Sequence, residues 1–312
     1  MKFNEHSCRW CGEAKYEVIV KGPDLLLDLP GDFQFVKCVN CGLLRQNPYP
    51  DWESLKEYYP EDYSSYLPQA SEIQSYSLRL DKRYGLWKRV NLVNKYKSSG
   101  RWLDIGCGTG RVLQEALVWE KWDLMGIEPV KHAAEYTHQR TGIPIINDRL
   151  ENFVGYENFF DIITMWDVLE HLNDPIKNLE KISEILKPNG LFVFSMPNLD
   201  SWDRKLFKAN WIGYDLPRHM HLFPANLLKE ILTKYDFTIL KKKCVAGSHG
   251  AFMLDLEFLS RGNKSKFLEK IISKGPDFII PRIFTLLPMW ILDRLKLGSN
   301  ITYVVQKNVT NK

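Results

Sequence analysis

The sequence lacks both a strong net charge and a long apolar run. Its 312 residues contain 42 lysines and arginines against 38 aspartates and glutamates, a formal net charge of +4. So small an excess does not by itself favour nucleic acid as the partner. No uninterrupted apolar stretch approaches the roughly 18 residues of a membrane span, and the first residues, MKFNEHSCRWCG, lack the apolar core of a signal peptide. We therefore expect a folded cytoplasmic protein.

Cysteine is also scarce, with six residues in all, and four of them form two Cys-x-x-Cys pairs. So few cysteines in a reducing compartment argue against a disulfide framework. Each pair precedes a glycine, in CRWCG and CVNCG, and 26 residues separate the pairs. Four thiolates in this pattern favour a closed, structural Zn²⁺ site, while free thiols and a redox pair are the alternatives. The expected ligands are Cys8, Cys11, Cys38 and Cys41.

From residue 100 onwards, short apolar strands alternate with amphipathic helices. RWLDI, DLMGI, FDIITMW and LFVFSM are predicted strands, and helical stretches such as IKNLEKISEILK follow or separate them. This succession indicates an α/β fold with a doubly wound parallel sheet in residues 100–312. Residues 1–68 lack the rhythm and are expected to be irregular, with residues 69–99 as a linking helix.

The segment LDIGCGTGR follows the first of these strands and opens the next helix. Its glycines at 106, 108 and 110 allow a sharp turn and a close approach of the backbone to a ligand. Asp104, just before the turn, would repel a pyrophosphate but suits a cationic group. Glu128, at the end of the second strand, is placed to bind the hydroxyls of a ribose. The pattern therefore predicts a ligand with a ribose and a positive charge.

Four segments in order, LDIGCGTG, GIEP, FDIITMWDVLEHLNDP and LKPNGLFVFSMPN, resemble the successive motifs of class I S-adenosylmethionine-dependent methyltransferases. The resemblance implies a Rossmann-like seven-stranded sheet and S-adenosylmethionine as the cofactor. Catalysis would then consist of aligning a nucleophile with the sulfonium methyl group and removing a proton. The implied cofactor-binding residues are Asp104, Gly106, Cys107, Gly108, Gly110, Glu128, Asp148, Leu150 and Trp166.

The N-terminal part, with FQFVKCVNCGLLRQNPYP and YYPEDY, resembles a small zinc-ribbon-like module of bacterial methyltransferases that modify polysaccharides and sugars. This resemblance implies a small-molecule acceptor, a sugar or glycan precursor methylated on a hydroxyl oxygen. A sugar C-methyltransferase is one alternative, and a non-catalytic binding protein that keeps the fold is another. An RNA methyltransferase that grips RNA with the zinc module is a third, although MWDVLEH differs from the Asn/Asp-Pro-Pro-Tyr motif of enzymes acting on base nitrogens.

Residues 197–224 follow the fifth strand and are expected to cover the carboxyl edge of the sheet as an acceptor lid. The segment WIGYDLPRHMHLF within the lid contains His219 and His221, which are spaced for opposite faces of an extended chain. We expect His219 to be the catalytic base, with Arg218 or Asp215 orienting it or the acceptor. A structural role for both histidines, bonded to backbone, is the alternative.

Two further segments leave alternatives open. DVLEH supplies Asp167, Glu170 and His171, which are either metal ligands, as in ubiquinone-type O-methyltransferases, or the polar start of a capped helix. The stretch 261–296, within an insertion at 249–298, has eight lysines or arginines against three acids and contains the uncharged IFTLLPMWIL. It is predicted either to contact an anionic membrane surface or to cover the core with apolar residues among solvated lysines.

Overall fold

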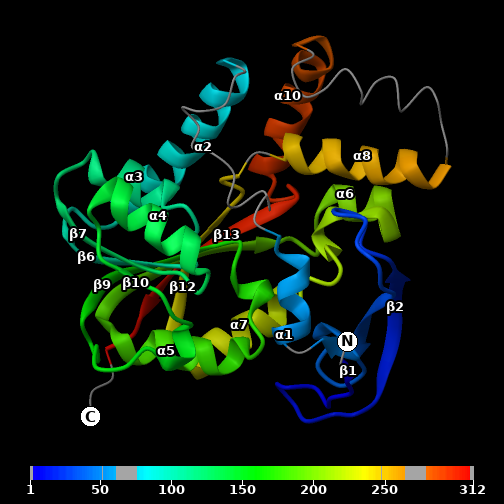
Figure 1. Cartoon of the computed structure of the whole chain (residues 1–312), viewed down its shortest axis with the longest axis horizontal. Coiled ribbons are helices and arrows are strands. Elements are labelled where there is room, and N and C mark those ends of the chain that lie inside the picture. Colours follow the sequence, from blue (N-terminus) through cyan, green and yellow to red (C-terminus); the bar gives the residue numbers. More distant parts are fainter. Residues whose placement is uncertain (1–2, 51, 61–75, 247, 264–278, 310–312) are drawn as a thin grey trace.

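The computed structural model describes residues 3–50, 52–60, 76–246, 248–263 and 279–309. Within these residues, the centre of the molecule is a seven-stranded sheet in the order β12-β13-β10-β9-β6-β7-β8. Neighbouring strands pair in parallel except for β13, which is antiparallel to β10 and β12. The topology, visible in Figure 1, confirms the predicted doubly wound, Rossmann-like α/β fold. The strands are β6 (Gly100–Ile105), β7 (Trp122–Ile127), β8 (Ile145–Ile146), β9 (Phe160–Trp166), β10 (Leu186–Pro197), β12 (Phe237–Lys243) and β13 (Asn300–Lys307).

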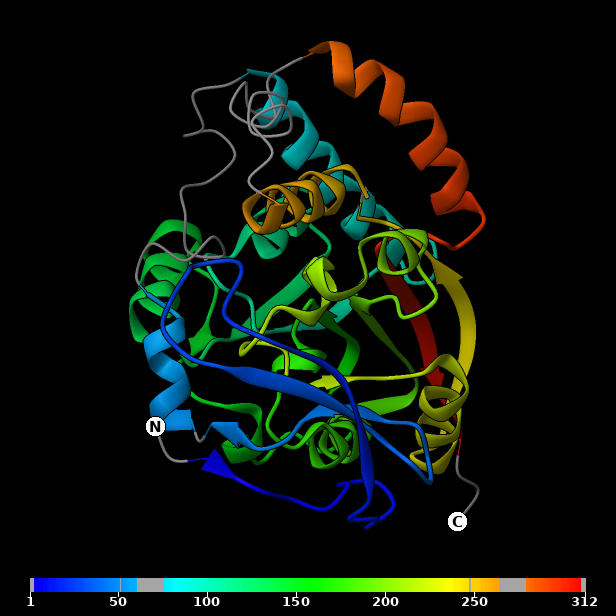
Figure 2. The ribbon, with the colours of Figure 1, turned by 90° about the vertical axis from the view of Figure 1, so that its right-hand side faces the viewer.

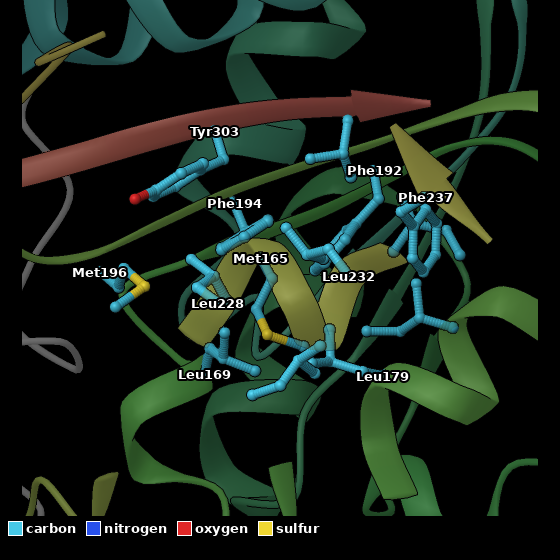
Figure 3. Close-up of a cluster of buried hydrophobic side chains, with 14 of the residues drawn as sticks. Met165, Leu169, Leu179, Phe192, Phe194, Met196, Leu228, Leu232, Phe237 and Tyr303 are labelled. Atoms are coloured by element: carbon cyan, nitrogen blue, oxygen red, sulfur yellow. The ribbon is translucent and has the colours of Figure 1, made fainter. Parts of the chain in front are cut away.

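Helices cover both faces of this sheet because side chains alternate between the faces along each strand. On β10, Phe192 and Phe194 belong to a buried cluster with α5 and α7, which Figure 3 shows in close-up. The intervening Leu191 and Val193 belong to a second cluster with α2 and α3. The helices around the sheet are α2 (Tyr76–Asn94), α3 (Arg111–Leu117), α4 (Lys131–Thr141), α5 (Pro175–Ile185) and α7 (Ala225–Lys234).

The N-terminal region forms an antiparallel sheet of its own, so the expectation of irregular structure before residue 68 is wrong for these strands. The sheet has the order β11-β4-β3-β2, with β2 (Tyr16–Gly22), β3 (Phe33–Cys38) and β4 (Leu44–Gln46). Its fourth strand, β11 (His221–Leu222), comes from the lid and pairs with β4. Two residues are too few for a sequence pattern to reveal a strand, because alternation needs at least four. The lid and the N-terminal region thus share one sheet.

Short elements and two longer helices complete the described chain. α8 packs against the lid and the N-terminal sheet, as Phe252, Leu256 and Leu259 contact a buried cluster that includes Phe35 and Trp211. Figure 2 shows α8 lying over this region. The additional elements are β1 (Phe3–Asn4), β5 (Tyr49–Pro50), α1 (Trp52–Leu55), η1 (Lys56–Tyr58), η4 (Leu150–Asn152), η5 (Leu169–His171), α6 (Trp202–Phe207), η6 (Lys208–Asn210), η7 (Ile212–Tyr214), α8 (His249–Asn263) and α10 (Ile279–Arg294).

The apolar segment IFTLLPMWIL lies inside α10, which is 16 residues long. A helix needs about 20 consecutive apolar residues to cross a bilayer. In the part of the chain that the structure describes, no helix meets both the length and the apolarity that a membrane span requires.

Candidate active site

A cavity opens at the carboxyl ends of β6, β7 and β9, the edge at which open α/β sheets bind ligands. Two groups of residues line it. The first, which we call the glycine group, comes from strand ends and the turns that follow them and includes Ile105, Gly106, Gly108, Ile127, Glu128, Asp148, Leu150 and Trp166. The second, which we call the histidine group, comes from the N-terminal region, from η5 and its following turn, and from the lid, and consists of Pro50, Leu55, Tyr59, His171, Leu172 and Met220.

The glycine turn after β6 has a backbone that other residues could not adopt without strain. Gly106 has φ +67°, and a Cβ added there would lie 2.6 Å from Cγ2 of Val168. Gly110, which precedes α3, has φ +71°, and its Cβ would lie 2.3 Å from Cγ2 of Thr137. Positive φ and contacts under 3 Å both favour glycine. The turn is therefore held open by the absence of side chains at these two positions.

Glu128 connects the end of β7 to this turn. Its Oε2 accepts the N–H of Gly108 at 2.8 Å, and its Oε1 accepts the N–H of Val130 at 2.9 Å. The side chain is buried, which raises its pKa, although both backbone hydrogen bonds act in the opposite direction. Each carboxylate oxygen has a further lone pair, so the side chain can still accept hydrogen bonds from a ligand's hydroxyls.

Asp104 lies behind the turn rather than on the cavity lining. Its Oδ1 accepts a hydrogen bond from Oγ1 of Thr164 at 2.5 Å. Burial raises its pKa to about 7, because a carboxylate without water is costly. A cation bound in the cavity would favour the ionised form of Asp104, so a sulfonium or an ammonium group fits this site electrostatically.

Six of the nine residues predicted to bind the cofactor line the cavity. The other three are Asp104, Cys107, which is buried, and Gly110, which initiates α3. Asp148, at the open end, is exposed, and its pKa is lowered first by a hydrogen bond from Asn152. The cofactor roles of all nine stay predictions. The cavity lining contains Gly106, Gly108, Glu128, Asp148, Leu150 and Trp166.

Sequence reasoning did not find Arg89, which α2 places over Trp166. The guanidinium carbon lies 5.2 Å from the centre of the indole ring, and Nη2 donates to Oδ2 of Asp167 at 3.2 Å. Asp167 in turn accepts hydrogen bonds from Ser195 at the end of β10 (2.8 Å) and from Asn300 of β13. A single arginine on a helix carries no recognisable signal in a sequence. Only the fold shows that the linking helix contributes to the site.

His171 lines the cavity and is the residue of the histidine group best suited to accept a proton. Its Nδ1 lies 3.0 Å from the carbonyl oxygen of Arg218 and 3.0 Å from Oη of Tyr59. Because a carbonyl only accepts, we assign the proton to Nδ1, which leaves the lone pair of Nε2 free to take up a proton. Burial, and next the neighbouring His219, lowers the pKa of His171 to about 3. The imidazole is therefore neutral at physiological pH.

His219, the predicted base, does not line the cavity but contacts His171. The two rings lie edge to face with their centres 4.6 Å apart. Nδ1 of His219 lies 2.9 Å from the carbonyl oxygen of Gly213, and Nε2 lies 3.9 Å from Oε1 of Glu170. Burial lowers the pKa of His219. The structure thus places His219, the predicted base, next to the site, where His171 lies between it and the cavity.

Glu170, His171 and His219 together could hold a divalent cation. One ligand atom of each lies within 4.8 Å of the others. Oε2 of Glu170 is buried without a hydrogen-bond partner among the described residues, and burial raises the pKa of this carboxyl well above its usual range. One carboxylate and two neutral imidazoles suit several divalent metals. Asp167, the ligand expected from the DVLEH segment, is bonded to Arg89 and Ser195, and His219 takes its place in this set.

Arg218 and Asp215 of the lid form a buried network of ion pairs with Asp24 of the N-terminal region. Arg218 is fully buried and donates to Asp24 at 2.5 and 2.8 Å and to Asp215 at 2.6 Å. Gln46 of β4 adds two hydrogen bonds of 2.6 Å to the carbonyl oxygens of Pro217 and His219. Arg218 does not line the cavity, so its predicted role as an orienting residue stays a prediction. These contacts show that the N-terminal region holds the histidine group in place.

The four predicted zinc ligands lie together at one end of the N-terminal sheet. Sγ of Cys8 is 3.5 Å from that of Cys41, and Sγ of Cys11 is 3.5 Å from that of Cys38. All four sulfurs lie within 4.8 Å of one another. In each pair, the following glycine donates its N–H to the first cysteine's carbonyl, at 2.8 and 3.0 Å. Zn–S bonds of about 2.3 Å place tetrahedral ligands roughly 3.8 Å apart, so the cluster fits Zn²⁺.

The chain matches known proteins over about half of its length. Ubiquinone biosynthesis O-methyltransferase of Proteus mirabilis is 30% identical over 158 residues, which cover 47% of this chain and 63% of the relative. The enzyme of the same name from Actinobacillus pleuropneumoniae serotype 7 is 30% identical over 173 residues, 46% of this chain and 73% of the relative. The match thus spans less than two thirds of the length of the former relative.

Solved structures share the fold at lower identity. A putative sarcosine dimethylglycine methyltransferase from Galdieria sulphuraria has a TM-score of 0.50 and 13% identity, covering 83% of this chain and 99% of its own. A putative methyltransferase in complex with the Haloferax volcanii Trm112 activator has a TM-score of 0.50 and 12% identity, covering 77% and 96%. The model of the methyltransferase domain family matches residues 79–242, more than half of the chain. The protein therefore belongs to the methyltransferase domain family.

Proposed function

We propose that the protein transfers the methyl group of S-adenosylmethionine to a hydroxyl oxygen of a small-molecule acceptor. The observation that carries the proposal is the composition of one cavity, in which a glycine turn and Glu128 stand together with Tyr59 and His171. A cofactor held by the glycine group would share this cavity with an acceptor held by the histidine group. The match to the methyltransferase domain over residues 79–242 supports the same conclusion.

The cofactor proposal rests on the fit of the glycine group. Glu128 can accept hydrogen bonds from ribose hydroxyls, and the buried Asp104 favours a ligand with positive charge. When bound, S-adenosylmethionine supplies a methyl group that is already activated by the sulfonium. The chain then has to align the acceptor, exclude water and take up a proton. Trp166, with Arg89 stacked on it, closes the cavity at the end of β9.

His171 and His219 are proposed to share the role of base. The acceptor hydroxyl would lie against His171, whose free Nε2 can receive its proton. The sequence predicts His219 for this step, and its position behind His171 supports a role in holding that ring. The low pKa of His171 keeps its imidazole unprotonated, the form that a base requires, well below neutral pH.

The acceptor is proposed to be a sugar or glycan precursor, as the N-terminal resemblance suggests. Relatives named for ubiquinone biosynthesis support O-methylation of a small molecule, without naming this acceptor. The apolar Pro50, Leu55, Leu172 and Met220 beside Tyr59 favour an acceptor that carries an apolar portion next to its hydroxyl. A glycan precursor linked to a lipid or an aromatic group has both features.

The experiment that tests this proposal measures cofactor binding and turnover separately. Calorimetry should detect S-adenosylmethionine binding to the purified protein. Release of S-adenosylhomocysteine is then measured against a panel of sugar nucleotides, lipid-linked sugars and phenols. His171→Gln and His219→Gln should each lower turnover by about 100-fold or more, with cofactor affinity within about threefold of the wild-type value.

His138→Gln is the matched control, because Nδ1 of His138 is also anchored by a backbone carbonyl, that of Ile143 at 2.9 Å, on α4 outside the cavity lining. It should leave both quantities unchanged. Full turnover by both His171→Gln and His219→Gln would contradict the base role alone. No binding of S-adenosylmethionine by the wild-type protein would contradict the proposed activity.

We also propose that the four clustered cysteines bind a structural Zn²⁺. The sulfur distances and the two glycine turns support this assignment. Metal analysis of the purified protein should find about one zinc per chain. Cys38→Ser should lose the metal, whereas Cys244→Ser, which changes a cysteine outside the cluster, should keep it. A protein that is folded and free of zinc would refute the proposal.

A further inference from the structure

The end of the molecule that carries α2 and α10 exposes several large apolar side chains. Both helices project from this end, away from the sheet, in Figure 1 and in the view turned by 90° in Figure 2. On α10 and just after it, the exposed residues follow helical spacing and so share one face. Six side chains on the two helices or directly after α10 are 40% to 64% exposed: Tyr84, Trp87, Leu287, Trp290, Ile291 and Leu295.

Cations lie among and beside these apolar residues. The guanidinium of Arg294 lies 4.2 Å from the centre of the Trp290 ring, and the ammonium of Lys88 lies 5.0 Å from that of Tyr84. The aromatic rings of Tyr84 and Trp87 stack with centres 5.8 Å apart. Aromatic rings paired with long basic side chains are typical of surfaces that enter the headgroup region of a bilayer.

A second group of cations comes from distant parts of the chain and includes the last residue of α10. Lys95 follows α2, Lys241 and Lys243 belong to β12, and Arg294 ends α10. The pKa of Lys243 is lowered, first by partial burial and then by the charges of the other three. Neighbouring like charges repel one another unless an anion neutralises them. The cluster therefore offers an anionic surface several contacts at once.

We propose that this end of the molecule docks on a membrane surface that contains anionic lipid. Trp290 and Ile291 would enter the headgroup region, and the cluster of Lys95, Lys241, Lys243 and Arg294 would contact lipid phosphates. In the stretch 261–296, for which membrane contact was one expectation, residues 264–278 lie outside the described part. The lysines of β12 and the aromatic residues of α2, which the sequence did not implicate, complete the surface. The proposal is independent of methyl transfer.

Co-sedimentation of the full-length protein with vesicles tests this proposal. Binding to phosphatidylcholine vesicles containing phosphatidylglycerol should be at least about tenfold tighter than to pure phosphatidylcholine, and should weaken as salt is raised. Trp290→Asp should lower binding to the anionic vesicles by about tenfold or more. Lys243→Gln should reduce binding to the anionic vesicles and leave the weak binding to neutral ones unchanged.

Val154→Asp is the matched control, since Val154 is 73% exposed in the loop before β9 and belongs to none of these elements. It should bind vesicles as the wild type does. Equal binding to both kinds of vesicle, or undiminished binding by Trp290→Asp, would overturn the proposal. Sedimentation velocity supplies a further outcome: a dimer that Trp290→Asp converts to a monomer would assign the surface to a second copy of the chain and exclude the lipid.

Discussion

The two groups of residues that line the cavity are built in different ways. The glycine group lies at the ends of adjacent parallel strands, and its main contacts, such as Gly108 to Glu128, join turns that follow neighbouring strands. The histidine group combines three distant parts of the chain. Tyr59 contacts His171 across 112 positions of the sequence, and Gln46 contacts the carbonyl of His219 across 173.

This difference separates what a sequence motif can specify from what only tertiary contacts can. The positive φ angles of the glycine turn are supplied by the glycines themselves, so a short sequence motif can specify the turn. The position of His171 and His219 depends on the N-terminal sheet, because the lid contributes β11 to that sheet. A change that breaks the N-terminal contacts should therefore disturb the histidine group and spare the glycine group.

Arg218→Met should have the largest effect, and on stability. It would leave the buried carboxyl groups of Asp24 and Asp215, both bonded to Arg218 at 2.5 to 2.6 Å, without their shared cation. Removing one partner from a buried ion pair costs about 3–5 kcal/mol. Denaturant unfolding measures this loss. Under conditions in which the variant is folded, S-adenosylmethionine affinity should stay near wild type while turnover falls.

The control for this variant is Arg101→Met, which breaks an exposed ion pair with Asp123 at 3.7 Å. An exposed pair contributes about 0–1 kcal/mol, so the control should unfold almost as the wild type does. If Arg218→Met were as stable as the control, the bracing of the lid by the N-terminal region would have no energetic support. If Arg218→Met lowered cofactor affinity as much as turnover, the glycine group would depend on the N-terminal contacts as strongly as the histidine group does.

Gly106→Ala should have the converse effect: it should lower the affinity for the cofactor and leave the lid unchanged. The new Cβ would meet Val168 at 2.6 Å with φ at +67°. Relieving that contact must move the turn or the residues after β9, and we expect S-adenosylmethionine affinity to fall by about 100-fold, or roughly 2.7 kcal/mol. Calorimetry measures this affinity. Gly250→Ala, with no atom within 4 Å of the added Cβ, should bind normally. Unchanged affinity in the first variant would show that the turn tolerates a side chain.

The longer strands of the seven-stranded sheet could be predicted because each of them carries its own signal in the sequence. β9 and the second half of β10 are mainly apolar, as buried parallel strands require, and the turn residues Pro188, Asn189 and Gly190 precede the apolar half of β10. The glycine turn was recognisable for a similar reason, since glycine spacing and the preceding strand lie within one short segment. The cysteine pairs were found because two pairs with the same spacing and the same glycine imply a shared site.

The histidine group was only partly predictable, and for a physical reason. His219 was named from its chemistry, but the pattern contained nothing to show that Arg218 would pair with Asp24 or that His171 would stand between His219 and the cavity. Tyr59 lies in a segment rich in tyrosine, where no spacing distinguishes one ring from another. Such contacts depend on how the N-terminal sheet packs on the lid, which residue types alone do not determine.

The smallest effect is expected from a change at His221. This residue belongs to β11, the strand by which the lid pairs with the N-terminal sheet. Its Nδ1 lies 3.2 Å from the carbonyl oxygen of Leu172, and burial, followed by the charge of Arg9, lowers its pKa to about 3. The unfolded chain, with an ordinary histidine pKa near 6.5, takes up the proton first as the pH falls. The stability that this histidine contributes is therefore complete above about pH 6.5 and declines by about 1.4 kcal/mol per pH unit below it.

His221→Asn removes that titration. At pH 7 the variant should be less stable than the wild type, because the packing and the hydrogen bond of the imidazole are altered. Between pH 7 and pH 5 the difference should shift by roughly 2 kcal/mol in favour of the variant, since only the wild type loses stability through protonation of the unfolded state. Denaturant unfolding at several pH values measures the shift, with the same substitution at the exposed His132 as the control. A difference that stays constant with pH would show that His221 is as free to protonate in the folded protein as in the unfolded chain, and that β11 does not seal the junction between the N-terminal sheet and the lid.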